Sequence, residues 1–153
     1  MARTRANGIE IEYDDAGPDN GPVVLLIMGL GAQLVRWPQE LVDSLVARGY
    51  RVIRFDNRDV GLSTKFDDRG IPSIVWTAMQ ARIGRTPMLP YTLTDMADDA
   101  VGLLDSLGID AAHIVGASMG GMIAQLVAAR HAARTLSLTS IMSTTGRPAH
   151  SRP

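Results

Sequence analysis

Residues 112–131 read AHIVGASMGGMIAQLVAARH, and this stretch decides the fold of the chain. It begins with a short apolar run, continues through a glycine-rich pentapeptide and ends in a segment rich in alanine, methionine and leucine. The apolar run is typical of a buried strand, and the last segment favours a helix. The stretch therefore predicts a strand, a very tight turn and a helix in direct succession.

The turn contains Gly116-Ala117-Ser118-Met119-Gly120, a G-x-S-x-G pattern. In a strand-to-helix turn of this kind the backbone of the serine is strained, and its hydroxyl stands clear of the sheet. Gly116 and Gly120 are expected to be small because side chains there would collide. The helix that follows presents free amide N–H groups to the site, where they favour developing negative charge. We therefore interpret Ser118 as a nucleophile, and a plain glycine-rich turn is the alternative.

The composition indicates a globular chain and excludes several kinds of function. Of the 153 residues, 46% are hydrophobic and 20% are charged, which suits one domain with its own core. The net charge of −1 gives no electrostatic reason to expect nucleic acid or an anionic membrane as a partner. The absence of cysteine excludes disulfides, thiolate metal ligands and cysteine nucleophiles. No apolar run is long enough to span a membrane, so we expect a cytoplasmic protein.

Strands and helices alternate along the rest of the chain. The predicted strands cover residues 9–13, 23–28, 51–55 and 136–142, and the predicted helices cover residues 37–48, 73–83 and 93–107. The run VVLLIM at 23–28 is continuously apolar, as expected of a strand that is buried on both faces. Residues 14–21, DDAGPDNG, are dense in turn formers and predict a hairpin-like loop. Thr92, followed three residues later by Asp95, predicts the N-terminal cap of the last of these helices.

This alternation predicts an α/β fold, in which a mostly parallel sheet carries helices on both faces. We expect about six strands and three main helices in one domain. Ligands of such sheets bind beyond the carboxyl ends of the strands. Four informative stretches follow predicted strands, namely 28–31, 56–59, the turn at Ser118 and 143–146. They should therefore converge on one cleft.

With these features the chain resembles the α/β-hydrolase fold family over essentially its whole length. In that family two backbone N–H groups form an oxyanion hole, one from the residue after the nucleophile and one from a loop after an earlier strand. The resemblance assigns these donors to Met119 and Leu30. The chemistry needs two donors aimed at the oxygen that becomes negative when Ser118 attacks a carbonyl group. For Gly29-Leu30-Gly31, a flexible loop that enters a helix is the alternative.

The segment FDNRDVGLS at 55–63 is similar to the family's D-x-R-x-x-G-x-S turn. We expect Asp56 and Arg58 to pair with each other and to brace the loops around the site. Two positions depart from the common pattern, because Met28 stands where a histidine often occurs and Asp59 stands in place of a glycine. In both departures the chain resembles the aclacinomycin methylesterase-like carboxylesterases, a branch of this family. They leave the backbone amides intact and bear on substrate preference rather than on the reaction class.

A serine hydrolase also needs a base that takes the hydroxyl proton and an acid that orients this base. In the family the acid follows the serine in the chain, and the histidine follows the acid. No Asp or Glu follows Ser118 in this chain. His113 precedes the turn, His131 lies about 20 Å further along the helix, and His150 lies in a tail without predicted structure. We expect all three to be surface or packing residues.

Residues 1–153 are therefore expected to form the N-terminal half of an α/β-hydrolase core. A C-terminal half, possibly a separate chain, would supply the acid and the histidine. The predicted function is a serine hydrolase of small carboxylic esters that uses no cofactor or metal and is inactive as the isolated fragment. The serine argues against dehalogenase and epoxide hydrolase chemistry. Two alternatives stay open, namely a perhydrolase activity of the same triad and a non-catalytic ligand-binding or assembly subunit.

Overall fold

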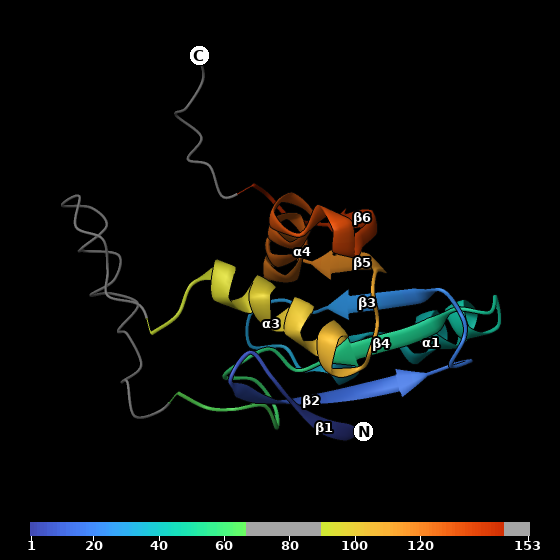
Figure 1. Cartoon of the computed structure of the whole chain (residues 1–153), viewed down its shortest axis with the longest axis horizontal. Helices are drawn as coiled ribbons and strands as arrows, with labels where there is room; N and C mark the ends of the chain where they lie inside the picture. Colours follow the sequence, from blue (N-terminus) through green and yellow to red (C-terminus); the bar gives the residue numbers. More distant parts are fainter. Residues whose placement is uncertain (67–89, 146–153) are drawn as a thin grey trace, which may run out of the picture.

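The structure, a computed structural model, describes residues 1–66 and 90–145, so the predicted helix over 73–83 lies outside the described residues. The strands in this part are β1 (Ala2–Ala6), β2 (Ile9–Ala16), β3 (Val23–Ile27), β4 (Arg51–Phe55), β5 (Ala112–Ala117) and β6 (Thr135–Ile141). The helices are α1 (Gln39–Val46), α3 (Leu93–Ser106) and α4 (Met119–Arg130), with 3₁₀ turns at Leu34–Arg36 and Ala132–Arg134. One sheet contains all of these strands in the order β1-β2-β4-β3-β5-β6 (Figure 1).

The sheet is mostly parallel, as predicted. β3 pairs in parallel with β4 on one side and with β5 on the other, and β6 continues the parallel set beside β5. β1 and β2 form an antiparallel ribbon, and β2 joins the sheet through an antiparallel pairing with β4. The carboxyl ends of β3, β4, β5 and β6 therefore lie along one edge of the sheet, where ligands of α/β sheets bind.

The prediction of a hairpin-like loop over 14–21 is wrong for residues 14–16 and for the hairpin, but the expected turn is present, because the Gly21 N–H donates to the Pro18 carbonyl oxygen at 3.0 Å. β2 extends to Ala16, and the strand that follows it in the chain, β3, is not its neighbour in the sheet. The aspartates at 14 and 15 are tolerated inside a strand because arginines on β4 match their charge. Asp14 pairs with Arg54 at 2.8 Å, and Asp15 pairs with Arg51 at 2.6 Å.

Helices cover both faces of the sheet and create two hydrophobic clusters. α3 and α4 lie on one face, and α1 lies on the other (Figure 1). All five residues of β3 are buried, because Leu25 and Ile27 point into the cluster under α3 and α4 while Val24 and Leu26 pack into the cluster that contains Val42 of α1. This two-sided burial explains the continuous apolar run of the sequence.

Local hydrogen bonds and a proline determine where the helices begin. At the start of α3, the hydroxyl of Thr92 accepts a hydrogen bond from the Asp95 N–H, and the Asp95 carboxylate accepts one from the Thr92 N–H, so the predicted cap is a full capping box. The hydrogen bonds from Thr92 lower the pKa of Asp95. α1 begins at Gln39 rather than at residue 37, because Pro38 has an extended backbone.

β6 forms one edge of the sheet. It pairs with β5 and with no other strand in the described ranges. Most of its residues are exposed, including Leu136 at 57% and Leu138 at 42% of their surface. Exposed apolar side chains on an unpaired strand edge are a surface that another strand can cover. None of the described helices is both long and apolar enough to cross a bilayer.

Candidate active site

Ser118 lies between the end of β5 and the first residue of α4. Its backbone has φ 56° and ψ −122°, a conformation that non-glycine residues rarely adopt, so the expected strain is present. Its N–H donates to the carbonyl oxygen of Ile141 at 2.9 Å, which ties the turn to the end of β6. The serine side chain is exposed. The predicted strand, tight turn and helix are thus confirmed.

The two glycines around Ser118 are required by close backbone approach. A Cβ at Gly116 would lie well inside 3.0 Å of the Gly120 carbonyl oxygen, and a Cβ at Gly120 would lie equally close to the carbonyl oxygen of Ile27. The prediction that both positions must be small is confirmed. The end of β3 is the neighbour that excludes a side chain at Gly120. The sequence of the turn alone does not predict this contact.

The loop after β3 passes directly against Ser118. A Cβ at Gly29 would lie 3.1 Å from the Cβ and 3.6 Å from the Oγ of Ser118. Residues 29–32 form a tight turn in which the Ala32 N–H donates to the Gly29 carbonyl at 3.2 Å, and Gly31 supplies the positive φ of 65° at the third position. The N–H of Leu30 is not used by this turn.

Two backbone N–H groups next to Ser118 are available to a ligand. Among the described residues, none accepts a hydrogen bond from the N–H of Leu30 or of Met119. Met119 is the first residue of α4, so its N–H has no acceptor within the helix. The positive end of the α4 dipole adds to the attraction of negative charge at this place. The arrangement can therefore hold an oxygen that carries negative charge beside the Ser118 hydroxyl.

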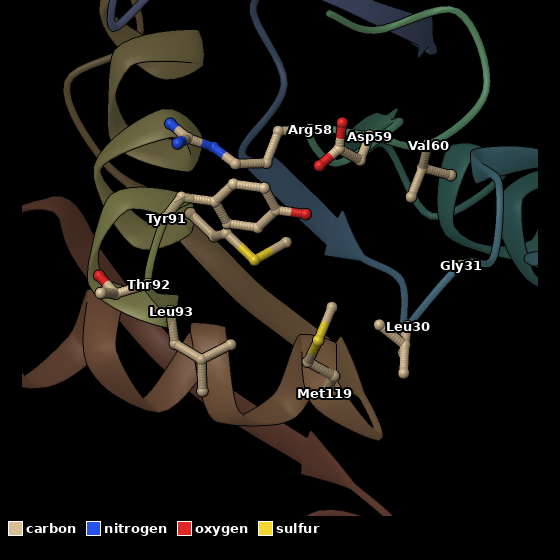
Figure 2. Close-up of a pocket in the computed structure, with 10 residues that line it drawn as sticks. Leu30, Gly31, Arg58, Asp59, Val60, Tyr91, Thr92, Leu93 and Met119 are labelled. Atoms are coloured by element: carbon tan, nitrogen blue, oxygen red, sulfur yellow. The ribbon is translucent and has the colours of Figure 1, made fainter. Parts of the chain in front are cut away.

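Two pockets meet at Leu30. The first has a volume of about 420 Å³ and is lined by Ser118 and Gly29 together with Trp37, Ile141 and Met142. The second has a volume of about 300 Å³ and is lined by Met119, Arg58 and Asp59, among others; Leu30 lines both pockets. Figure 2 shows Leu30 and Met119 on the same side of the second pocket. The stretches after β3, β4 and β5 therefore converge as predicted. The stretch 143–146 does not join them: Met142 lines the first pocket, but residues 143–145 line neither of these two pockets, and Gly146 lies outside the described residues.

A tyrosine closes the far side of the second pocket. The hydroxyl of Tyr91 points toward Asp59 (Figure 2) and is hydrogen-bonded to it. Burial and this hydrogen bond raise the pKa of Tyr91 to about 12, so the phenol is neutral at ordinary pH. The guanidinium of Arg58 lies over the Tyr91 ring, 5.1 Å from its centroid. Asp59 has φ 63°, a left-handed conformation that glycine adopts without steric cost.

The predicted pairing of Asp56 with Arg58 is wrong. Arg58 instead forms a two-pronged ion pair with Asp99 of α3, with N–O distances of 2.6 and 2.7 Å, and both side chains are buried. Burial alone would lower the pKa of Arg58, but the hydrogen bonds and charge of Asp99 outweigh burial and raise it. The pair fixes the chain after β4 to the middle of α3. The sequence gives no signal for it, because the partners are 41 residues apart.

Asp56 braces the site through backbone groups. Its Oδ1 accepts a hydrogen bond from the Leu34 N–H at 2.7 Å, and its Oδ2 accepts one from the Leu62 N–H at 3.1 Å. The neighbouring residue, Asn57, donates from its side-chain amide to the carbonyl oxygen of Met28 at 2.9 Å. Sequence reasoning missed Asn57. Its position directly after Asp56 was the sequence feature that could have indicated a role for Asn57 near the site.

The histidines of the described part lie away from Ser118. His113 is near the start of β5, roughly 16 Å from Ser118 at the rise of an extended strand, and its Nδ1 is 2.8 Å from the hydroxyl oxygen of Ser137. His131 follows the last residue of α4, and its Nε2 is 2.8 Å from a carboxylate oxygen of Asp98. His150 lies outside the described residues. Within 1–66 and 90–145, no group of three or more His, Asp or Glu side chains could hold a metal ion.

Comparisons with known proteins agree with the observed fold. The sequence profile of the alpha/beta hydrolase fold matches residues 22–152. The chain is 35% identical over 125 residues to rhodomycin D methylesterase DauP of Streptomyces sp. strain C5, covering 82% of this chain and 36% of that protein. It is 31% identical to the putative carbamate hydrolase RutD of Variovorax paradoxus, covering 92% of this chain and 45% of that protein.

A solved structure shows the same likeness. The enol-lactonase from Burkholderia xenovorans LB400 matches with a TM-score of 0.67 and 32% identity over 88% of this chain and 44% of that chain. This chain therefore spans less than half the length of each of these relatives.

Proposed function

The chain belongs to the alpha/beta hydrolase fold family, and on this basis we propose that it is the N-terminal half of a carboxylic ester hydrolase that works through an acyl-enzyme on Ser118. The observation that carries the proposal is the strained turn at Ser118, which lies against a loop and a helix start with two available N–H groups. Relatives named as a methylesterase, a carbamate hydrolase and an enol-lactonase support a hydrolytic reaction on a small molecule.

In the proposed reaction the Ser118 oxygen attacks the carbonyl carbon of the ester, and the carbonyl oxygen becomes negative. The N–H groups of Leu30 and Met119 donate to this oxygen, a role in which losing one donor costs about 10²–10³ in turnover. A histidine takes the serine proton and passes it to the leaving alcohol, which gives the acyl-enzyme. Water, deprotonated by the same histidine, then attacks the acyl carbon, releases the carboxylic acid and restores the serine.

We assign the histidine and its orienting acid to a C-terminal half of the same hydrolase, either continuous with this chain or a separate chain. Two observations support this assignment. No acidic residue follows Ser118, and the histidines of the described part lie far from it. The relatives are more than twice as long as the matched region. Below, the completed hydrolase means residues 1–153 together with this C-terminal half.

The proposal is tested by the turnover of Ser118→Ala in the completed hydrolase. Turnover of a short activated ester should fall by at least about 10³, because the nucleophile is lost while the fold is kept. Ser106→Ala, at the end of α3, makes the same chemical change away from both pockets and should leave turnover unchanged. Esterase activity that persists unchanged in Ser118→Ala would rule out the nucleophile assignment.

A further inference from the structure

Two consecutive side chains after β4 hold the loop that carries Leu30. We call residues 28–34 the oxyanion loop. The Asn57 side-chain amide donates to the Met28 carbonyl oxygen at one end, and the Asp56 carboxylate accepts the Leu34 N–H at the other end. Asn57 is 2% exposed and Asp56 is 4% exposed, so both hydrogen bonds are protected from water.

Leu34 is buried and Met28 packs partly against the core, but residues 29–31 between them have little else to fix their position next to Ser118. The Leu30 side chain is 81% exposed and anchors the loop poorly, and Gly29 and Gly31 have no side chains. The turn bond between Ala32 and Gly29 sets the local shape of the loop but not its place relative to the serine. That place depends on the peptide groups at the two ends of the loop.

We propose that Asn57 is a positioning residue of the oxyanion hole. By holding the Met28 carbonyl, it sets the peptide that leads into Gly29, and hence the place of the Leu30 N–H. An oxyanion donor works only when it lies about 2.7–3.1 Å from the position of the developing negative oxygen. The inference rests on the proposed roles of Ser118 and Leu30.

Asn57 is itself held firmly enough to act in this way. Its own carbonyl oxygen accepts a hydrogen bond from the Val60 N–H at 3.0 Å. The carbonyl of the preceding residue, Asp56, accepts one from the Ser63 hydroxyl at 2.6 Å, and the Ser63 oxygen in turn accepts the Glu12 N–H at 3.0 Å. The turn after β4 is therefore tied to β2, and the Asn57 amide extends from it to the oxyanion loop.

The test is steady-state kinetics of Asn57→Asp and Asn57→Ala in the completed hydrolase. The first variant keeps the shape but replaces the donor with an acceptor, and the second removes the donor without adding charge. Both should lower kcat by about 10- to 100-fold, because a misplaced donor acts only on the transition state, and should change KM by less than about twofold. Affinity for a trifluoromethyl ketone, which forms an oxyanion on the serine, should fall by the same factor as kcat.

Thr64→Val is the matched control. It removes two hydrogen bonds between the same turn and the backbone of Glu10 in β2, and the Thr64 hydroxyl bonds to neither Asn57 nor the oxyanion loop, so the variant should lower the thermal midpoint and leave kcat unchanged. The positioning role is overturned if the Asn57 variants keep full kcat, if Thr64→Val lowers kcat equally, or if both Asn57 variants fail to fold while Thr64→Val folds. Each of these outcomes leaves the proposed function standing as long as Ser118→Ala is inactive. An active Ser118→Ala would instead overturn the proposed function.

Discussion

Asp56 satisfies two backbone donors at once, the N–H groups of Leu34 and Leu62. Asp56→Asn offers only one acceptor oxygen, and its NH₂ group would face the other N–H. A buried donor without a partner costs about 1–3 kcal/mol. We expect the thermal midpoint of the completed hydrolase to fall by several degrees, measured by calorimetry, while turnover changes little, because the remaining amide oxygen can still accept the Leu34 N–H and keep that end of the oxyanion loop in place. A large loss of turnover at an unchanged midpoint would instead give Asp56 a part in catalysis.

The close approach of Gly61 to this carboxylate explains another feature of the turn. A Cβ at Gly61 would overlap the Asp56 carboxylate, and the backbone there has φ 50°. The glycine of the D-x-R-x-x-G-x-S pattern thus leaves room for the side chain that braces the oxyanion loop. The aspartate and the glycine of the motif therefore form one structural unit.

At the scale of elements, the junction of β3, β5 and α4 depends on Gly120. In Gly120→Ala the new Cβ would overlap the carbonyl oxygen of Ile27, so α4 has to move away from β3 and carry Ser118 with it. We expect the variant to lose at least about 1–3 kcal/mol of stability and most of its turnover.

Gly49→Ala is the control for Gly120→Ala, because it introduces backbone strain without a steric overlap. Gly49 has φ 85°, but a Cβ there meets no atom within 4 Å. The variant should lose about 1–2 kcal/mol from the left-handed backbone and keep its turnover. Chemical denaturation and ester hydrolysis, measured on both variants, make the comparison. A Gly120→Ala protein with normal turnover would show that the packing of α4 on β3 does not set the position of the serine.

Sequence patterns predicted those elements whose residues carry their own signal. The strand 23–28, the helix 93–107 with its cap and the stretch 112–131 each have a local periodicity or turn chemistry, and the structure confirms them. β1 (Ala2–Ala6) was missed because it reads ARTRA, with too little apolar content to stand out.

Contacts between distant segments could not be predicted from local patterns. Arg58 pairs with Asp99 because the turn after β4 reaches α3, and Asn57 contacts Met28 because β4 and β3 are neighbours in the sheet. Both contacts depend on the order of the strands. That order is a property of the assembled sheet, which the spacing of residues along the chain does not encode.

At the scale of the whole molecule, the edge at β6 predicts how the isolated chain behaves. Leu136 and Leu138 lie exposed on a strand whose outer edge has no partner strand in the described part. Such an edge favours association, and charged side chains on it oppose association. We expect residues 1–153 alone to associate in light-scattering measurements and to lack enzymatic ester hydrolysis. Adding the C-terminal half should give monodisperse, active material.

Leu138→Lys is the matched variant for this prediction. In the isolated chain it should reduce association, because a charge on the edge disfavours pairing, but it should not restore activity, because no base is gained. A monodisperse 1–153 chain that hydrolyses the ester at an enzymatic rate lost in Ser118→Ala would contradict the assignment of the base to a C-terminal half. His150 would then be the first base to test.

The most direct test of the central claim is covalent labelling of the completed hydrolase with a fluorophosphonate, followed by peptide mass spectrometry. A serine activated by a base and beside two oxyanion donors should react once per molecule, and the adduct should lie on Ser118. Activity should fall in proportion to labelling, and Ser118→Ala should remain unlabelled. Loss of activity with the adduct on another residue, or full activity with Ser118 completely labelled, would contradict the account.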